Sequence, residues 1–109
     1  MLYRVTAHIL KEKMPAFHEA LTNGTIQNQK PDGAEIVAAM KRAVITAPGI
    51  IEWYETCYCP TPLQHERATV FDHYLTEIEA VPVETSEEIK GEPFWVYLEQ
   101  VSKFPPGDP

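Results

Sequence analysis

Residues 67–81 constrain the fold of this chain more than any other segment. They read RATVFDHYLTEIEAV, are rich in β-branched and aromatic side chains, and contain neither glycine nor proline. This composition is typical of a long β-strand, and Pro82 would end it. Asp72 and His73 are neighbours within the predicted strand, so their side chains would point to opposite faces of the sheet. We therefore expect only one of the two to face the core.

The remaining elements are predicted from hydrophobic periodicity and from the positions of proline, glycine and capping residues. In chain order they are a strand over 3–10, a helix from Pro15 to Leu21, a loop over 25–31, a helix over about 33–46, a strand over 50–59, a short helix from Thr85 to Lys90, and a last strand over 94–101. The order of elements is then β-α-α-β-β-α-β.

This order is a split βαβ arrangement with one extra helix. It resembles the ferredoxin-like α+β architecture and the dimeric barrel proteins related to it. The resemblance covers residues 1–101 and rests on element order alone. It implies a four-stranded antiparallel sheet with helices on one face. It assigns no functional residue.

At 109 residues the chain is long enough for one domain with a modest core. We expect this domain to span residues 1–103, and residues 104–109 to form a proline-rich tail that can join neither sheet nor helix. Apolar runs are much shorter than the ~20 residues that cross a bilayer. The N-terminus lacks a charged region followed by an apolar one. We therefore expect a cytoplasmic protein that does not bind membranes.

The net charge of −7 is spread unevenly along the chain. Residues 1–50 contain six Lys or Arg and four Asp or Glu, whereas residues 51–109 contain three and twelve. Nucleic-acid binding depends on Lys and Arg at the phosphate backbone, so this distribution argues against it. The acidic half is expected to be a solvated surface, and the alternative is recognition of a basic partner.

A sheet with helices on one face leaves its other face open. Several rings and apolar side chains are expected on that open face, which is too much apolar area to leave in water. They are drawn from Tyr54, Tyr58, Phe71, His73, Leu75, Trp95 and Tyr97. A two-fold homodimer would cover them. The alternative is that the extra helix or the tail covers this face.

A histidine beside a carboxylate is the most reactive arrangement that the predicted fold offers. The first and third strands are adjacent in the split βαβ order, which would bring His8 toward Asp72 or His73. Glu52 or Glu55 would lie nearby. A carboxylate beside an imidazole favours the charged ring and makes a general acid–base pair. We take His8, Asp72 and His73 as candidate catalytic residues, and the alternative is a polar cluster that only satisfies itself.

Ligand contacts are expected from the same face of the sheet. Arg4 shares the face of His8 and could bind an anionic group of a substrate. The expected ligand-binding residues are Arg4, Glu52, Tyr54 and Tyr97.

Cys57 and Cys59 are two positions apart, so on a strand both thiols would share one face. A disulfide between them would close a small, strained loop, and we expect reduced thiols. Zinc sites usually place two to four residues between cysteines. We therefore expect no metal, the alternatives being a site completed by His65 or His73, or a cysteine nucleophile activated by histidine. No glycine-rich phosphate loop is present, and no cofactor is expected.

These features predict a small homodimer that binds a small organic ligand or a partner protein at the sheet face. One alternative is a cofactor-independent enzyme for proton transfer, isomerisation or oxygenation that uses the His/carboxylate pair. Another is an acidic regulatory or interaction subunit.

Overall fold

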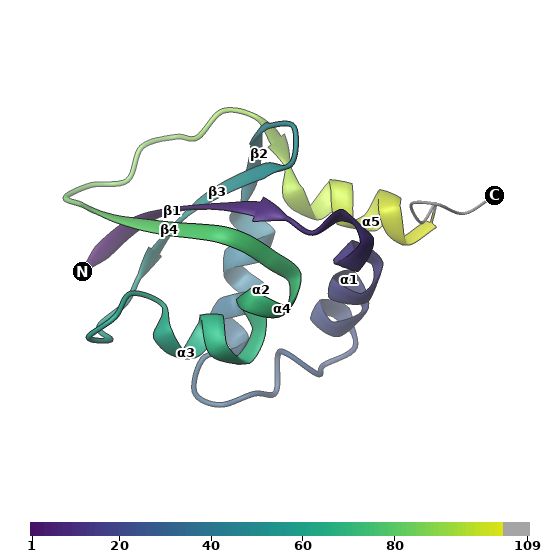
Figure 1. Cartoon of the computed structure of the whole chain (residues 1–109), viewed down its shortest axis with the longest axis horizontal. Coiled ribbons are helices and arrows are strands. Elements are labelled where there is room, and N and C mark those ends of the chain that lie inside the picture. The colour runs from purple at the N-terminus through teal and green to yellow at the C-terminus, as the bar shows by residue number, and fades with distance from the viewer. Residues whose placement is uncertain (104–109) are drawn as a thin grey trace.

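The chain forms an antiparallel sheet of five strands in the order β4-β1-β3-β2-β5 (Figure 1). The structure is a computed structural model that describes residues 1–103, so the predicted tail lies outside the described residues. The strands are β1 Leu2–Ile9, β2 Val44–Ala47, β3 Ile50–Thr56, β4 Leu75–Val83 and β5 Glu92–Pro93. The predicted α+β class is confirmed. The predicted four strands and their ferredoxin-like order are wrong.

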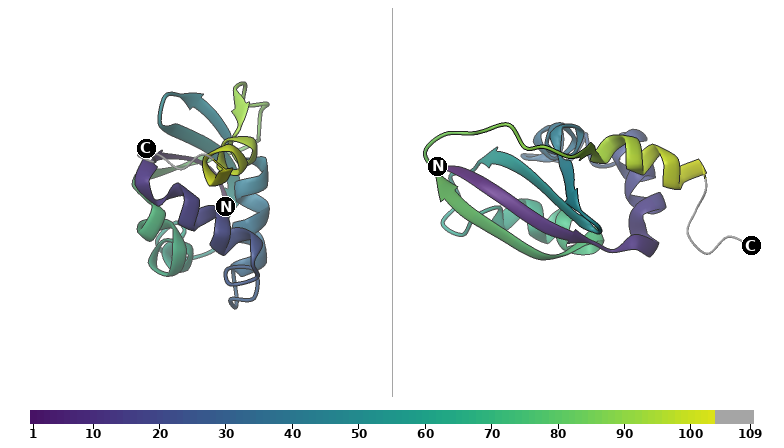
Figure 2. Two further views of the ribbon diagram at one scale, coloured as in Figure 1. Left: turned by 90° about the vertical axis from the view of Figure 1, so that its right-hand side faces the viewer. Right: turned by 90° about the horizontal axis from the view of Figure 1, so that it is seen from above.

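Helices pack against one face of this sheet and against one another (Figure 2). They are η1 Lys11–Lys13, α1 Met14–Thr22, α2 Gly33–Arg42, α3 Gln64–Glu66, η2 Arg67–Phe71, α4 Asp72–Tyr74 and α5 Phe94–Lys103. The core lies between them and the inner faces of β1 and β3. At its centre the rings of Trp53 and Phe71 lie 5.3 Å apart. Within residues 1–103, none of the helices has the length and apolar character needed to cross a membrane.

The first strand, the first helix and the loop after it are confirmed. Val5 and Ala7 of β1 are fully buried, as alternation predicts. In α1, Pro15 occupies the first turn and Phe17 is fully buried. The loop over 25–31 contains no helix or strand.

The predicted helix over 33–46 ends early, at Arg42, and the chain turns directly into β2. Residues 44–47 then pair with β3 through a hairpin whose turn is Pro48-Gly49. Gly49 has φ +77°, which suits the second central position of a tight turn that begins with proline. The following strand ends at Thr56 rather than at residue 59, so neither cysteine is on a strand.

The segment predicted as one strand over 67–81 contains two different elements. Residues 64–74 form a continuous helical run in which α3, the π-helical turn η2 and α4 follow one another, and only then does β4 begin. The buried side chains of Leu63, Glu66 and Val70 recur at helical spacing along this run. The prediction of a strand is therefore wrong for its first half.

Residues 84–91, which we call the crossing segment, contain neither the predicted short helix nor any strand. Figure 1 shows the segment running from the end of β4, at one edge of the sheet, to β5 at the other. It ends at Gly91, where a Cβ atom would clash with the backbone oxygen of Ile45. The last element, predicted as a strand over 94–101, is helix α5.

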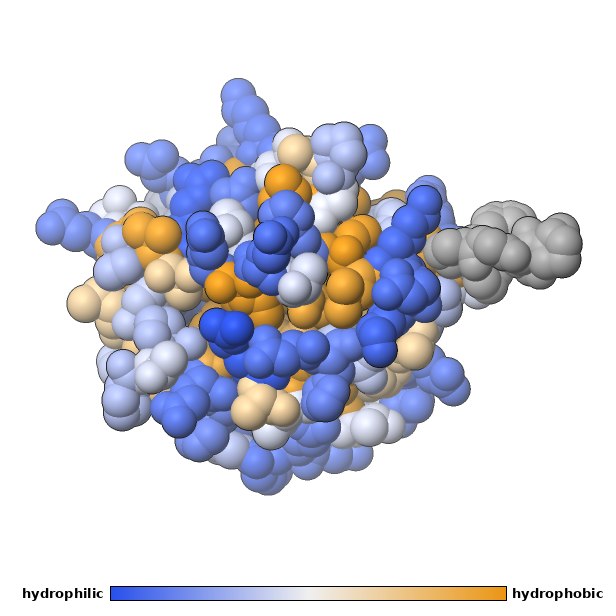
Figure 3. Space-filling view, viewed as in Figure 1, coloured by the Kyte–Doolittle hydropathy of each residue, from blue (hydrophilic) through white to orange (hydrophobic). Residues whose placement is uncertain are grey.

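These differences change the open face of the sheet. Phe71 and Leu75 are buried in the core, and Trp95 and Tyr97 lie on α5 against that core. Tyr54 lies on the outer side of β3 and is half-buried, while Tyr58 is exposed. In the view of Figure 3, apolar atoms at the middle of the surface are bordered and partly crossed by hydrophilic side chains. The predicted concentration of rings on the open face is wrong.

Candidate functional site

A buried carboxyl group stands at the end of β3. Alternation along this strand turns Ile51, Trp53 and Glu55 toward the core, and Glu55 is only 1% exposed. The indole Nε1–H of Trp53 donates a hydrogen bond of 2.9 Å to Oε1 of Glu55. One of the two oxygens of Glu55 therefore has a fixed donor.

A second buried carboxyl group, that of Glu66, meets the first from the helical run. The chain reaches Glu66 through Leu63, which adopts a left-handed conformation with φ +59° and is itself buried. Glu66 is 5% exposed. It is followed at once by the π-helical turn, a distortion that is frequent at functional sites.

The two carboxyl groups share a low-dielectric site, and this keeps a proton on the pair at neutral pH. Burial, the hydrogen bond to Glu55 and the charge of Glu55 together raise the pKa of Glu66 to about 10, and burial is the largest of these causes. Burial also raises the pKa of Glu55, although the hydrogen bonds from Glu66 and Trp53 oppose this. Glu66 is therefore the protonated member and Glu55 the carboxylate.

Among the described residues, Oε2 of Glu55 and Oε2 of Glu66 have no hydrogen-bond donor. A buried oxygen without a donor is costly. A proton shared between the two carboxyl groups supplies one hydrogen bond between them, as in other pairs of close carboxylic acids.

Glu66 also lines a cavity of about 340 Å³, which we call the Glu66 pocket. Its walls come from the start of α2, from the loop after β3 and from the helical run. They consist of Asp32, Thr56, Cys57, Tyr58, Cys59, Leu63, His65 and Glu66. Nδ1 of His65 lies 3.9 Å from Oδ2 of Asp32 at the rim. Glu55 lies behind Glu66 and does not line the pocket.

The loop after β3 wraps around the sulfur of Cys57. The backbone N–H groups of Cys59 and Leu63 each approach Sγ of Cys57 at 3.4 Å. Cys57 is 7% exposed and Cys59 is half-buried, and both thiols are free. In residues 1–103, no three His, Cys, Asp or Glu side chains are grouped in a way that could hold a metal ion.

The three predicted catalytic residues do not come together. Asp72 and His73 lie on α4 instead of on a strand, and Asp72 pairs with Arg67 at 3.2 Å. His8 does lie beside β4, as strand adjacency predicted, but Nδ1 of His8 meets Oε2 of Glu77 at 3.3 Å. A His/carboxylate pair thus exists with a different carboxylate.

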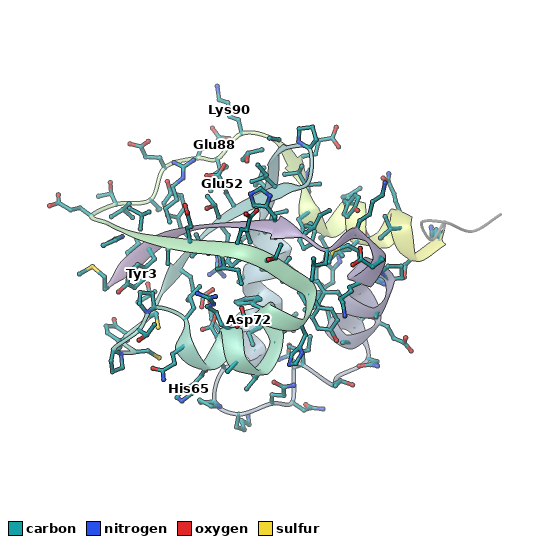
Figure 4. The ribbon with its side chains drawn as sticks, in the orientation of Figure 1. Tyr3, Glu52, His65, Asp72, Glu88 and Lys90 are labelled. Carbon is teal, nitrogen blue, oxygen red and sulfur yellow. The ribbon has the colours of Figure 1, made fainter. Side chains whose placement is uncertain are left out.

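Three of the four predicted ligand-binding residues do lie together, on the outer face of the sheet. Arg4 contacts Glu52 at 3.0 Å, and its guanidinium lies 5.8 Å from the centre of the Tyr54 ring. Tyr97 lies on α5, where its ring stacks on Phe94. Figure 4 shows Glu52 on the sheet and well separated from Asp72 and His65 on the helical run.

A groove of about 510 Å³ lies beside this cluster, between the outer face and the crossing segment. It is lined by Leu2, Arg42, Val44, Trp53, Tyr54, Ser86, Glu87, Glu88 and Ile89. The crossing segment therefore covers part of the open face of the sheet. The covers considered from the sequence were a second copy of the chain, the extra helix and the tail.

Sequence reasoning missed Glu66 and Asp32. Glu66 occupies a position of the helical stripe that usually holds an apolar residue, and that placement was the available signal. Asp32, at the N-cap position of α2, also lines the pocket.

Comparisons with protein families, with curated proteins and with solved structures found no match.

Proposed function

We propose that this chain is a binding protein for a small organic cation, such as a primary amine, and that the Glu66 pocket holds the cationic group. The buried Glu55–Glu66 pair carries the proposal. Two carboxyl groups that retain a proton in a dry site offer a position that an ammonium group can occupy instead. The ammonium group would then pair with the ionised carboxylate of Glu66, which lines the pocket, while that of Glu55 lies behind it.

The charge and size of the pocket support the same ligand class. Its described walls contain the acidic side chains of Asp32 and Glu66 and no Lys or Arg. Such a cleft concentrates cations and repels anions. A volume of about 340 Å³ is at the small end of the range for ligand sites. A compact amine fits this space better than a nucleotide or a long peptide.

The proposal is tested by calorimetry with n-butylamine as the probe and with butyrate as the size-matched anion. We expect n-butylammonium to bind and to displace a proton, which makes the heat depend on the ionisation enthalpy of the buffer. Because one proton is exchanged, affinity should increase by up to about tenfold per pH unit between pH 6 and pH 8.

Glu66→Gln keeps the shape of the side chain but has no proton to release. It should bind n-butylammonium more weakly and without the pH dependence. Glu79→Gln, an exposed position on β4, is the matched control and should behave as the wild type. Equal binding of butyrate and n-butylammonium, or an unchanged affinity in Glu66→Gln, would contradict the proposal.

A second candidate is the sequence-based expectation of a ligand at the outer face, in the groove beside Arg4. It is supported by the contacts of Arg4 with Glu52 and Tyr54, which point a guanidinium along that face. An anion would be its ligand, and His8 with Glu77 would be the pair available for proton transfer there. Butyrate binding that is lost in Arg4→Met and kept in Glu66→Gln would favour this site.

A further inference from the structure

Two thiols open into the Glu66 pocket. Cys57 and Cys59 both line it, and Glu66, 5% exposed, stands in the same wall with a buried oxygen that has no donor among the described residues. A small molecule that enters this pocket therefore meets two sulfur atoms and a carboxylic acid together.

The sulfur of Cys57 accepts two backbone hydrogen bonds inside the loop that follows β3. The N–H groups of Cys59 and Leu63 donate them, each at 3.4 Å. Glu66, which lines the same pocket, is the protonated member of the buried carboxyl pair.

The thiol of Cys59 is the more exposed partner and is in contact with Cys57. The hydrogen bond to Cys57 raises the pKa of Cys59. Cys59 is therefore the hydrogen-bond donor of the pair, and Sγ of Cys57 is the acceptor. Both residues lie beyond the end of β3, in an irregular loop, so strand geometry does not fix the directions of their side chains.

We propose that Cys57 and Cys59 form a thiol–disulfide exchange site for low-molecular-weight disulfides, in which Cys57 attacks and Cys59 resolves. The thiolate of Cys57 attacks one sulfur of a disulfide RSSR, which forms a mixed disulfide and releases RS⁻. Cys59 gives its proton to RS⁻ and then attacks Sγ of Cys57, which releases the second RS⁻. This second RS⁻ takes from the solvent the proton that Cys57 lost when it ionised. The chain loses two electrons and two hydrogens as an intramolecular disulfide forms, and RSSR is reduced to two RSH.

The test is the reaction of the reduced chain with oxidised glutathione, followed by intact mass spectrometry. We expect the wild type to lose two hydrogens and to retain no glutathionyl group. Cys59→Ser should stop at the mixed disulfide and retain one glutathionyl group on Cys57. Cys57→Ser should react at Cys59 at least about tenfold more slowly than Cys59→Ser reacts at Cys57.

A measurement on the unmodified wild type keeps the proposal testable if a variant does not fold. With limiting iodoacetamide, fragment-ion mapping should find Cys57 alkylated before Cys59. Preferential alkylation of Cys59, a wild type that retains glutathionyl groups, or a Cys57→Ser variant as fast as Cys59→Ser would overturn the proposal. Iodoacetamide contains no amine, so the outcome of the alkylation assay is independent of the proposed cation binding.

Discussion

Glu66 is the residue whose surroundings differ most from those of an ordinary surface side chain. Its carboxyl group is buried beside that of Glu55, and ionising both would place two negative charges together in a medium that solvates neither. Holding a proton avoids that cost. The position is therefore tolerated in the core at low pH and becomes progressively less favourable as the pH rises.

This predicts an unusual dependence of stability on pH. The pKa of Glu66 in the folded chain is about 10, and that of an unfolded glutamate is about 4.3. Between these values the folded chain holds a proton that the unfolded chain has released. The stabilising contribution is thus complete below about pH 4 and is lost as the pH rises toward about 10. In Glu66→Gln the free energy of unfolding should change less between pH 6 and pH 8, by up to about 1.4 kcal/mol per pH unit.

Chemical denaturation followed by the fluorescence of the buried Trp53 measures this difference. Glu79→Gln, which removes an exposed carboxylate, should keep the wild-type slope. A Glu66→Gln variant with that same slope would show that Glu66 is ionised in the folded chain.

At the residue scale, the sequence indicates which kinds of side chain pair with one another more readily than which individual residues form each pair. It identified His8 as part of a His/carboxylate pair and placed Arg4 with Glu52 and Tyr54, because strand alternation decides which residues share a face. It did not identify Glu77 as the partner of His8, because that contact depends on a register shift between β1 and β4. Glu66 was missed because a charged residue interrupts the apolar count on which helix prediction depends.

At the element scale, the strand predicted over residues 94–101 is wrong because side-chain composition and apolar periodicity indicate different elements there. Residues 94–101 contain many aromatic and β-branched side chains, which favour a strand by composition. Their apolar positions nevertheless recur at helical spacing, since Phe94 and Leu98 are fully buried while Val96 is 46% exposed. Periodicity was the better guide there, and composition was given too much weight.

The helical assignment of α5 makes a prediction that a strand would not. On a strand, Val96 and Leu98 would share a face. On α5 Leu98 reaches the core and Val96 does not, so Leu98→Ala should lower the free energy of unfolding by about 2–5 kcal/mol. Val96→Ala should change it by less than about 0.5 kcal/mol.

Urea denaturation of the two variants beside the wild type provides the measurement. Comparable losses in both variants would indicate that residues 94–101 form a strand with Val96 and Leu98 on its buried face.

The hairpin of β2 and β3 shows a second limit of element prediction. Val44, Ile45 and Thr46 are three β-branched residues in succession, a pattern that disfavours a helix. The helix predicted over about 33–46 includes all three residues and stops before Pro48-Gly49. The same dipeptide is also a signal for a tight turn between strands, and pairing with β3 decides between the two.

At the scale of the whole molecule, the fold class and the first third of the chain could be predicted, but the coverage of the sheet could not. Which residues remain open depends on the path of the crossing segment, and irregular backbone has no periodic signal. The predicted homodimer stays a prediction, and it no longer has the support of the rings, because Phe71, Trp95 and Tyr97 pack with the core.

The crossing segment has a consequence for how the molecule can be divided. It carries the chain past the whole width of the sheet, and most of its residues are exposed. Among the described residues, the C-terminal part is held by the pairing of β5 with β2, by the hydrogen bond from the Phe94 N–H to the Ala43 oxygen, by the hydrogen bond between Ser102 and His18, and by the packing of α5. We therefore expect the chain to divide between residues 87 and 88 into a body of residues 1–87 and a C-terminal segment that packs on it.

Separate chains of residues 1–87 and 88–103 should therefore reassemble when mixed, with Phe94 and Leu98 refilling the vacant part of the core. Far-ultraviolet circular dichroism of the mixture should exceed the sum of the two fragments, and Leu98→Ala in the shorter fragment should weaken the association. Spectra that simply add would mean that the unbroken connection is required for folding. If the fragments do recombine, this chain can be used as a two-piece reporter, with its breakpoint on a surface loop remote from both Glu66 and the thiols.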